Sequence, residues 1–463
     1  MKNKILLINA INPNIEVEQR QPSLGLGYLA SSLRRSFGKE KFDFRVIDRN
    51  IEEEIREFRP LIVLISSVTQ NFDIAIRYAG FVKQQKIPVI IGGIHISVLP
   101  SNLNENFDIG VIGEGEAVIV DLFELFLKKN KFVNKDLGSI KGILFRDGDS
   151  IHFTGARALI NDLDSIQLPA RDLLKIERHT YMFSSRGCPY KCIFCASTRF
   201  WDKVRLFSPE YVSQEIRELA ERYKVSVISL YDDLFIADKK RLEKIVGLLG
   251  REKFIRKVSF TCNCRANLVT DEVVGLLKNM NVRSINLGLE SGCEKTLRYL
   301  KGNVSVEQNY QAIKIIKRHG IACQGSFIIG SPFESEKDIA QTYDFIKKSP
   351  LNLIDVNVLT PFPGTPVWDY ANSRGLVSEN MDWSKLNVNF SSNIKDAIIL
   401  SEVLNKKDIV KLFKKIMRLR FIKNILGVLN HPYRRDVPKM ALKLLRDQIH
   451  KAFCKKDGFL LNG

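Results

Sequence analysis

Long apolar runs are missing from this chain, and cysteine and histidine are scarce. No stretch reaches the roughly 18 consecutive apolar residues that a membrane-spanning helix needs, so the sequence predicts none. Three of the eight cysteines fall in one short stretch, and the six histidines make no Cys/His pairing typical of a zinc finger. We find no internal repeat and no low-complexity tract, which argues against solenoid and disordered proteins.

The first residues, MKNKILLINAINPN, are basic and then apolar. The apolar run is short, contains Asn9 and lacks a small-residue cleavage site, so we expect a buried strand and not a signal peptide. A cytoplasmic chain with reduced thiols follows from this expectation. Clustered cysteines in that compartment indicate metal binding or catalysis before disulfides.

Length and composition indicate a globular protein of several domains. The chain has 463 residues, of which 45% are hydrophobic and 27% are charged, enough for two or three domains. Its formal charge is +19, and residues 401–463 hold sixteen Lys or Arg against five Asp or Glu. This basic end is either a solvated tail or a surface for an anionic partner, such as a membrane or nucleic acid.

Residues 1–130 alternate strand-like and helix-like patterns. Apolar residues at helical spacing, such as Leu26, Leu29, Leu33 and Phe37, alternate with short apolar runs such as LIVLISSV. The alternation predicts a doubly wound, Rossmann-like α/β domain, which binds ligands beyond the carboxyl ends of its strands. The residues at these ends are Asp48, Ser66, Ser67, Gly92, Gly93, Gly113, Glu114 and Gly115.

The rest of the chain divides into three parts. Residues 131–180 are expected to form a linker with a hairpin around Asp147-Gly148. Residues 181–385 contain six candidate strands with helices between them, which predicts a complete or partial parallel (β/α)6 barrel of the TIM type. Residues 386–463 form a basic helical C-terminal segment.

Three of the cysteines, Cys188, Cys192 and Cys195, fall in the stretch RGCPYKCIFC with the spacing C-x3-C-x2-C. A [4Fe–4S] cluster is usually held by four thiolates, so three would leave one iron open to another ligand. Structural zinc sites need four ligands, commonly as two pairs, and no second pair is evident. The spacing favours iron–sulfur over zinc, with inert core cysteines as the remaining alternative.

This stretch resembles the cysteine loop of the radical S-adenosylmethionine (SAM) superfamily, with Phe194 at the aromatic position. The resemblance implies that the three cysteines bind a [4Fe–4S] cluster whose fourth iron is chelated by SAM. It further implies reductive cleavage of SAM to a deoxyadenosyl radical, with an electron donor such as flavodoxin or ferredoxin.

Four later segments resemble SAM-binding motifs of the same superfamily: YDDLF, CRAN, GLESG and FIIGSPFE. The last one departs from the usual G-x-I-x-G-x-x-E pattern, because Ser326 replaces the first Gly and Glu334 comes one residue late. Alone, each residue could be a helix cap or a turn. The residues that the resemblance implies for SAM binding are Asp232 or Asp233, Arg265, Glu290, Ser291 and Gly330.

Residues 1–130 resemble the leader domain of the cobalamin-binding branch of radical SAM enzymes. The resemblance implies cobalamin contacts at Ser66, Gly92, Gly93, Gly113, Glu114 and Gly115. The common D-x-H-x-x-G signature is absent, because Asp48 is followed by Arg49-Asn50-Ile51-Glu52-Glu53. No histidine is therefore expected as an axial ligand there, and a domain that has lost its cofactor stays an alternative. His95 follows a different strand and is expected to line its loop by hydrogen bonding, not to bind cobalt.

The segment 404–427 has apolar residues at 409, 412, 413, 416 and 419 between Lys and Arg. It is either a helix packed on the barrel or a basic amphipathic helix that contacts a membrane surface.

The resemblance favours methylation of an unactivated carbon or phosphorus of a small-molecule or lipid-like substrate. The alternative is a cyclase or rearranging enzyme of tetrapyrrole or lipid biosynthesis. Methylthiotransferases carry an N-terminal trio of cysteines, whereas the first cysteine here is Cys188. A nucleic-acid-binding protein is not expected, since no recognition motif accompanies the basic end. Beyond the residues expected to bind the cluster, SAM and cobalamin, the sequence identifies no catalytic residue.

Overall fold

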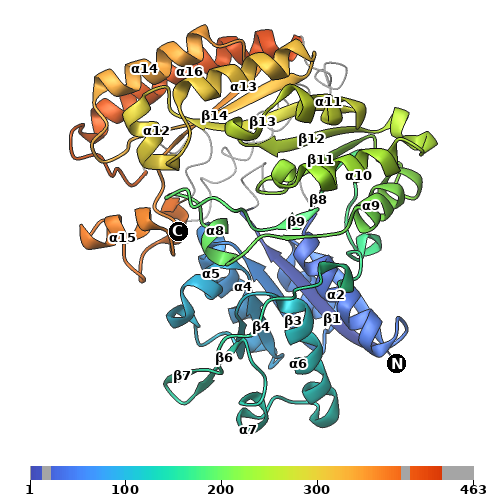
Figure 1. Ribbon diagram of the computed structural model, residues 1–463. Helices are drawn as coiled ribbons and strands as arrows, with labels where there is room; N and C mark the ends of the chain where they lie inside the picture. The colour runs from blue at the N-terminus through green and yellow to red at the C-terminus, as the bar shows by residue number, and fades with distance from the viewer. Residues whose placement is uncertain (1, 13–21, 387–396, 430–463) are drawn as a thin grey trace, which may run out of the picture.

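The computed structural model describes residues 2–12, 22–386 and 397–429. Two sheets lie one above the other, and a short linking region passes between them (Figure 1). Cys454 and the rest of the basic end after residue 429 lie outside the described residues.

The first sheet has seven strands in the order β2-β1-β3-β4-β5-β6-β7. The first five strands pair in parallel, while β6 and β7 are antiparallel additions at one edge. The predicted hairpin around Asp147-Gly148 is confirmed, and it extends this sheet because β6 pairs with β5. The strands are β1 (Asn3–Ala10), β2 (Phe42–Ile47), β3 (Ile62–Ser67), β4 (Val89–Gly92), β5 (Ile109–Val111), β6 (Ile143–Asp147) and β7 (Ser150–Phe153).

Helices cover both faces of this sheet, as a doubly wound domain requires. The apolar stripes of α2 and α6 pack in one buried cluster with Ile5 and Leu7, and those of α3, α4 and α5 pack in another with Leu6 and Ile8. This alternation along β1 explains why the strand is apolar on both sides. The helices are α2 (Leu24–Phe37), α3 (Ile51–Phe58), α4 (Phe72–Gln84), α5 (Ile94–Val98), α6 (Gly115–Lys129) and α7 (Asn134–Leu137).

The second sheet has six parallel strands in chain order, β15-β14-β13-β12-β11-β8. Its edge strands β8 and β15 do not pair with each other, so the sheet is a partial barrel, as the six-strand pattern allowed. The strands are β8 (His179–Met182), β11 (Val227–Leu230), β12 (Ser259–Cys264), β13 (Val282–Glu290), β14 (Ala322–Ile329) and β15 (Leu353–Val358).

Most helices of the second unit start at side-chain caps. Ser305 with Gln308, and Ser335 with Asp338, form reciprocal capping boxes at the first turns of α13 and α14. These helices cover the outer face of the sheet (Figure 1). They are α9 (Pro209–Glu221), α10 (Lys239–Leu249), α11 (Asp271–Asn279), α12 (Glu294–Lys301), α13 (Val306–Arg318), α14 (Glu336–Lys348) and α16 (Lys406–Leu429). Helix α15 (Pro366–Ser373) lies apart from this sheet and packs in a buried cluster with residues of the first unit (Figure 1).

The two units share a buried core. Trp368 and Trp383, which follow the last barrel strand, pack in the same cluster as Phe72 of the first unit. The backbone N–H of Trp383 also donates to the Asp73 carboxylate at 3.1 Å. The apolar residues of α16 that the sequence singled out are buried at 409, 412, 413 and 416, which confirms packing on the barrel for this stripe. Among the described helices, none combines the length and apolarity that crossing a bilayer requires.

Candidate active site

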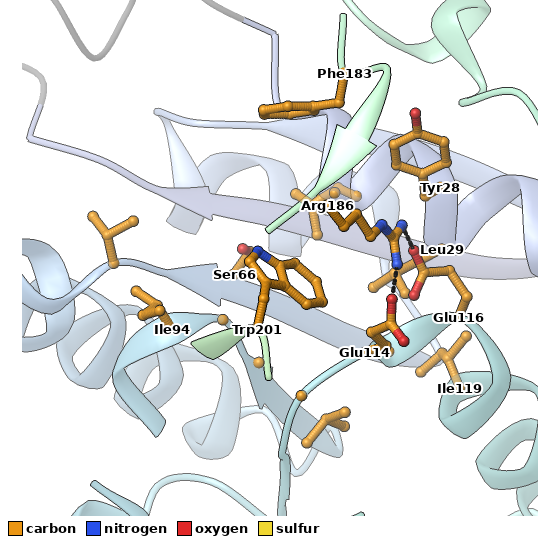
Figure 2. A pocket seen from close by; sticks show the side chains of 18 of the residues that line it. Tyr28, Leu29, Ser66, Ile94, Glu114, Glu116, Ile119, Phe183, Arg186 and Trp201 are labelled. Atoms are coloured by element: carbon orange, nitrogen blue, oxygen red, sulfur yellow. Dashed lines mark hydrogen bonds and ion pairs between the residues drawn. The ribbon is translucent and has the colours of Figure 1, made fainter. Parts of the chain in front are cut away.

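The carboxyl ends of the parallel strands in the two sheets face one another across a cavity of about 580 Å³. One wall comes from the first sheet and its loops, including all six residues predicted to contact cobalamin. The other wall comes from the cysteine-loop region and the second sheet, through Phe183, Arg186, Trp201 and Asp233. Figure 2 shows Arg186 and Trp201 in this cavity, beside Glu114 and below Phe183.

The three cysteines lie on the loop between β9 (Ser185–Arg186) and α8 (Ser197–Phe200). All three side chains are half-buried and none is in a disulfide. The pKa of Cys188 is raised to about 11, chiefly by burial and to a smaller extent by the nearby Asp233, Cys192 and Cys195. Thiols in such a setting need a bound cation to become thiolates, because metal binding displaces their protons. This chemistry fits an iron–sulfur cluster shared by the three cysteines.

Backbone geometry holds this loop in place. Gly187 has φ +90°, and a Cβ there would come within 2.8 Å of the Lys203 carbonyl oxygen. Further along, the N–H of Ile193 donates to the Leu300 carbonyl at 3.1 Å. Among the described residues, no three His, Cys, Asp or Glu side chains lie close enough together to bind a single metal ion.

Arg265, which the resemblance implied as a SAM contact, lies beside the cysteine loop. Its guanidinium donates to Cys192 Sγ at 3.3 Å and to the Lys301 carbonyl at 2.9 Å. The ring of Tyr190, itself part of the loop, lies 3.9 Å from the guanidinium carbon. The buried Arg265 guanidinium therefore stabilises negative charge on the Cys192 sulfur, and its contact with the Tyr190 ring orders the cysteine loop.

The two aspartates of YDDLF have different surroundings. Asp232 is 1% exposed and accepts hydrogen bonds from Ser184 N–H, Ser184 Oγ and Ser185 Oγ. Asp233 is exposed, lines the cavity and accepts from Ser197 Oγ at 2.5 Å. Asp232 thus secures the strand that leads into the cysteine loop, and only Asp233 faces the space where a ligand would sit.

Glu290 ends β13 in a left-handed conformation, with φ +61°. The β13–β14 register shifts at this point, and the buried Glu290 carboxylate lies 3.5 Å from Lys301 Nζ. Burial raises the pKa of Glu290, against the opposing effect of Lys301. A strained, buried carboxylate at a strand end is a common feature of ligand sites.

The remaining predicted SAM contacts differ in accessibility. Ser291 is fully buried, and its hydroxyl lies 3.0 Å from that of Thr342, so it supports the turn after β13. Gly330 has φ +88° and donates its N–H to Glu334 Oε2 at 2.6 Å. Phe194 is half-buried and lines a second cavity of about 370 Å³.

Glycines shape the wall that the first sheet contributes. Gly113 has φ +78°, and a Cβ there would meet no atom within 4 Å, so it leaves open space. A Cβ on Gly93, which has φ +110°, would overlap the Ser67 carbonyl oxygen. The open space at Gly113 and the largely apolar lining fit a bulky cofactor such as cobalamin.

None of the described residues that line this cavity is a histidine. His95 lies in the core, where its ring stacks on Phe72 at 3.8 Å between centroids. Its Nε2 lies 3.3 Å from the Asn102 amide nitrogen, and burial lowers its pKa to about 3. The expectation that His95 is not an axial ligand agrees with this position.

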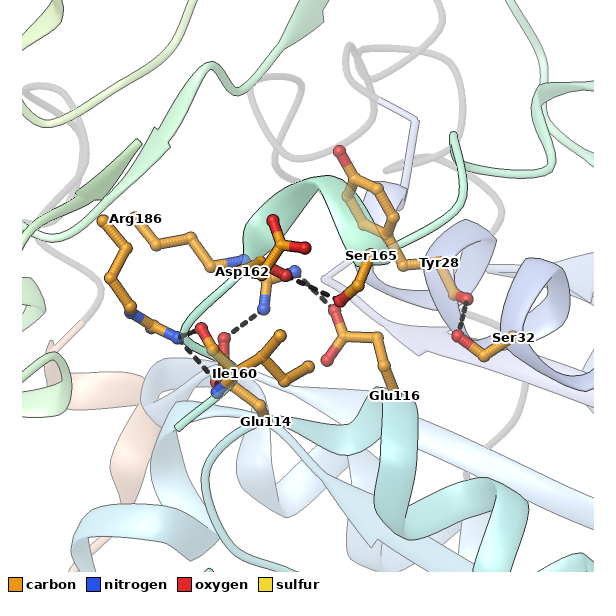
Figure 3. A network of polar contacts seen from close by, with 9 residues as sticks. Tyr28, Ser32, Glu114, Glu116, Ile160, Asp162, Ser165 and Arg186 are labelled. Atoms are coloured by element: carbon orange, nitrogen blue, oxygen red, sulfur yellow. Dashed lines mark hydrogen bonds and ion pairs between the residues drawn. The ribbon is translucent and has the colours of Figure 1, made fainter. Parts of the chain in front are cut away.

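Sequence reasoning missed a buried ion-pair network that joins the two units (Figure 3). Arg186, two residues before Cys188, pairs with both Glu114 and Glu116 at the start of α6. Arg205 Nη1 donates to Glu114 Oε2 at 2.8 Å. Burial would raise the pKa of Glu114, but the arginines outweigh it and the pKa is lowered. Glu114 was predicted as a cofactor contact, and here its carboxylate also binds Arg186.

Comparison with known proteins identifies both units. Residues 13–123 match the B12 binding domain family, and residues 182–346 match the radical SAM superfamily. An uncharacterized methyltransferase from Pyrococcus horikoshii is 30% identical over 385 residues, which cover 79% of this chain and 81% of that protein.

Two further relatives differ in their named activities. The anaerobic magnesium-protoporphyrin IX monomethyl ester cyclase of Cereibacter sphaeroides is 26% identical over 80% of this chain and 63% of its own length. The structure of TsrM from Kitasatospora setae, a radical SAM methyltransferase with cobalamin and a [4Fe–4S] cluster bound, shares the fold. It has a TM-score of 0.65 and 18% identity over 81% of this chain and 76% of that one. The chain belongs to the radical SAM superfamily, in the branch that carries a B12-binding domain.

Proposed function

We propose that this radical SAM enzyme is a cobalamin-dependent methyltransferase acting on an unactivated carbon or phosphorus. The observation that carries the proposal is the shared cavity, which both the B12-binding unit and the cysteine-loop region line. A methyl carrier held by the first unit and a radical source held by the second must meet at one substrate. The cavity between them supplies that meeting place.

When bound, the cluster supplies the electron that cleaves SAM to a deoxyadenosyl radical, and cobalamin supplies a transferable methyl group. The chain's own residues position these groups. We assign the cluster to Cys188, Cys192 and Cys195, with Arg265 ordering the loop through Cys192. Asp233, facing the cavity, is the carboxylate that we assign to the SAM amino group.

Glu290 and Gly330 are assigned to SAM as well, since both lie at the carboxyl ends of barrel strands in left-handed backbone. We assign cobalamin to the wall formed by Ser66, Gly92, Gly93, Gly113, Glu114 and Gly115. Arg186 holds the radical-forming loop against this wall by its pairing with Glu114.

The second cavity supports a small-molecule or lipid-like substrate. Its lining includes four aromatic side chains, those of Phe194, Phe200, Trp201 and Phe362, and Trp201 also lines the first cavity. Apolar and aromatic walls favour ligands with an apolar body. We place the apolar part of the substrate here, with the reacting atom directed toward the first cavity.

A cyclase that uses the radical without methyl transfer is the second candidate, and the similarity to the protoporphyrin ester cyclase favours it. The two candidates differ in the fate of SAM. Methyl transfer consumes one SAM to methylate cobalamin and another to form the radical, so it yields S-adenosylhomocysteine as well as deoxyadenosine. Cyclisation yields deoxyadenosine without S-adenosylhomocysteine.

The test is a product assay on the full chain, reconstituted without oxygen with iron, sulfide and cobalamin and supplied with reductant and SAM. We expect both nucleoside products, and methyl-labelled SAM should transfer its label to cobalamin. Deoxyadenosine alone would indicate the cyclase, and the absence of both products would contradict either function. The Cys192→Ala variant serves as the control for cluster-dependent cleavage.

A further inference from the structure

The last helix of the described chain, α16, lies along the barrel edge strand β15 and is fastened to it by polar contacts. Asn424 accepts from the N–H of Ile354 at 2.8 Å and donates to its carbonyl at 3.0 Å. Arg420 donates to the same carbonyl at 2.9 Å. A Cβ on Gly427 would overlap the Asn352 carbonyl, so the helix touches the strand's backbone directly. These contacts fix which face of the final turns points outward.

The outward face changes character along its length. Its first turns expose Lys and Arg, and its last turns expose large apolar side chains. At 100° per residue, both sets lie on the side opposite the buried stripe of Ile409 and Ile416. The cations are Lys407, Lys411, Lys414, Lys415 and Arg418. The apolar residues, with their exposed fractions, are Phe421 (68%), Ile422 (57%), Ile425 (49%) and Leu426 (59%).

This apolar group differs from the other exposed apolar residues of the described chain, such as Phe153 and Leu376, which are isolated. Contiguous exposed apolar side chains on a rigid element mark an interaction surface. The group also lies on the opposite side of α16 from Ile409, Leu412, Phe413 and Ile416, which are buried on the barrel.

We propose that the outward face of α16 binds the surface of an anionic lipid bilayer. The four apolar side chains would enter the headgroup–acyl boundary, and the row of cations would contact the anionic headgroups. Residues 430–463, which follow directly, contain eight further Lys or Arg against three Asp or Glu. This charge agrees with an anionic partner.

Other occupants fit the same face less well. A second copy of the chain would cover the apolar group but would offer the row of cations no anionic partner. Nucleic acid would pair with the cations but would leave Phe421, Ile422, Ile425 and Leu426 in water. A bilayer satisfies both groups and requires no matching pocket. This inference is independent of the proposed methyl transfer.

The test is co-sedimentation of the full chain with vesicles of equimolar phosphatidylglycerol and phosphatidylcholine, compared with phosphatidylcholine alone. We expect binding to the anionic vesicles that weakens as salt is raised, because screening reduces the headgroup attraction. The double variant Phe421→Ser/Ile425→Ser should lower the partition coefficient by on the order of tenfold or more. Phe153→Ser removes another exposed aromatic side chain (50%), far from α16, and should leave binding unchanged.

Lys414→Gln combined with Arg418→Gln should weaken binding mainly at low salt. Light scattering of the same preparations reports the oligomeric state. If the wild type is a dimer that does not bind vesicles, and the Phe421→Ser/Ile425→Ser variant is monomeric, the outward face of α16 would be assigned to a contact with a second copy of the chain. If the wild type is monomeric and does not bind anionic vesicles, the outward face of α16 would be assigned to a contact with residues 430–463 of the same chain. Either result would overturn the proposal.

Discussion

Arg186 of β9 forms a buried ion pair with Glu114 at the start of α6, and the two residues belong to different units of the chain. The side chains are only 11% and 5% exposed, and Arg186 also pairs with Glu116. Since Arg186 stands two residues before Cys188, this contact ties the position of the cysteine loop to the B12-binding unit. The distance between the two cofactor sites therefore depends on a pairing that neither unit makes alone.

Replacing Arg186 should test this coupling. In Arg186→Ala, Glu116 loses its arginine partner and Glu114 keeps only Arg205 and the Ile160 N–H as partners, so the free energy of unfolding should fall by about 3 kcal/mol. Chemical denaturation measures the loss, and cobalamin retention on a desalting column should fall with it. Arg318→Ala breaks the exposed pair with Asp271 and should leave the free energy of unfolding almost unchanged. Equal losses in the two variants would contradict a special role for the buried pair.

The cluster assignment predicts a clear difference between cysteines. Cys192→Ala should lose most of the bound iron and the visible absorption of the cluster, because a thiolate ligand is gone. Cys262→Ala is the matched control, since Cys262 is buried in the barrel core beside Cys264, with 3.8 Å between the sulfurs. Iron analysis and absorption spectra of anaerobic preparations report both. Wild-type iron content in Cys192→Ala would refute the assignment.

Substituting the two aspartates of YDDLF should have different effects, on stability for Asp232 and on SAM binding for Asp233. Asp232→Asn disturbs a fully buried acceptor of three hydrogen bonds and should lower the free energy of unfolding by about 2 kcal/mol. Asp233→Asn should keep wild-type stability but weaken SAM binding by about tenfold, through loss of a charge-assisted hydrogen bond. Denaturation and equilibrium binding of SAM separate the two effects. The opposite pattern would place Asp232 at the ligand.

Glu334 predicts a pH dependence of stability. Burial raises the pKa of Glu334 from 4.5 to about 7, although the N–H groups of Gly330 and Ser331 lower it. The folded state therefore holds this proton more tightly than the unfolded state. The resulting stabilisation is complete below the unfolded pKa and is lost as pH rises from about 4.5 to about 7.

Glu334→Gln keeps an acceptor for both N–H groups but cannot ionise. Relative to this variant, the wild type should lose on the order of 3 kcal/mol of unfolding free energy across that pH range. Denaturant titrations at several pH values give the difference. Parallel pH profiles for the two proteins would show that the carboxyl titrates normally.

Gly187 should be intolerant of a side chain. Gly187→Ala places a Cβ 2.8 Å from the Lys203 carbonyl in a left-handed conformation, at a cost of about 1–3 kcal/mol. The cysteine loop should shift, and iron content should fall with stability. Gly275→Ala in α11 meets no atom within 4 Å and should instead stabilise by about 0.5–1 kcal/mol. A stable, fully loaded Gly187→Ala variant would show that the loop adapts.

The order of the elements was accessible from the sequence because it depends on local patterns. Period-two and continuous apolar runs marked the strands, and helical spacing marked α2, α4 and α6. The hairpin at Asp147-Gly148 followed from turn chemistry alone. Local pairing rules could not show that this hairpin joins the first sheet, since that pairing is with β5, more than thirty residues earlier.

The sequence by itself determined the cysteine cluster and its spacing, the two strand–helix alternations and the glycines at the strand ends, because each is a property of neighbouring residues. Only the tertiary structure decided that Asp233 and not Asp232 faces the cavity, and that Arg186 reaches Glu114 across the two units. It also decided which face of α16 is buried. These outcomes depend on which distant surfaces pack together, and a pattern of residues along the chain does not contain that information.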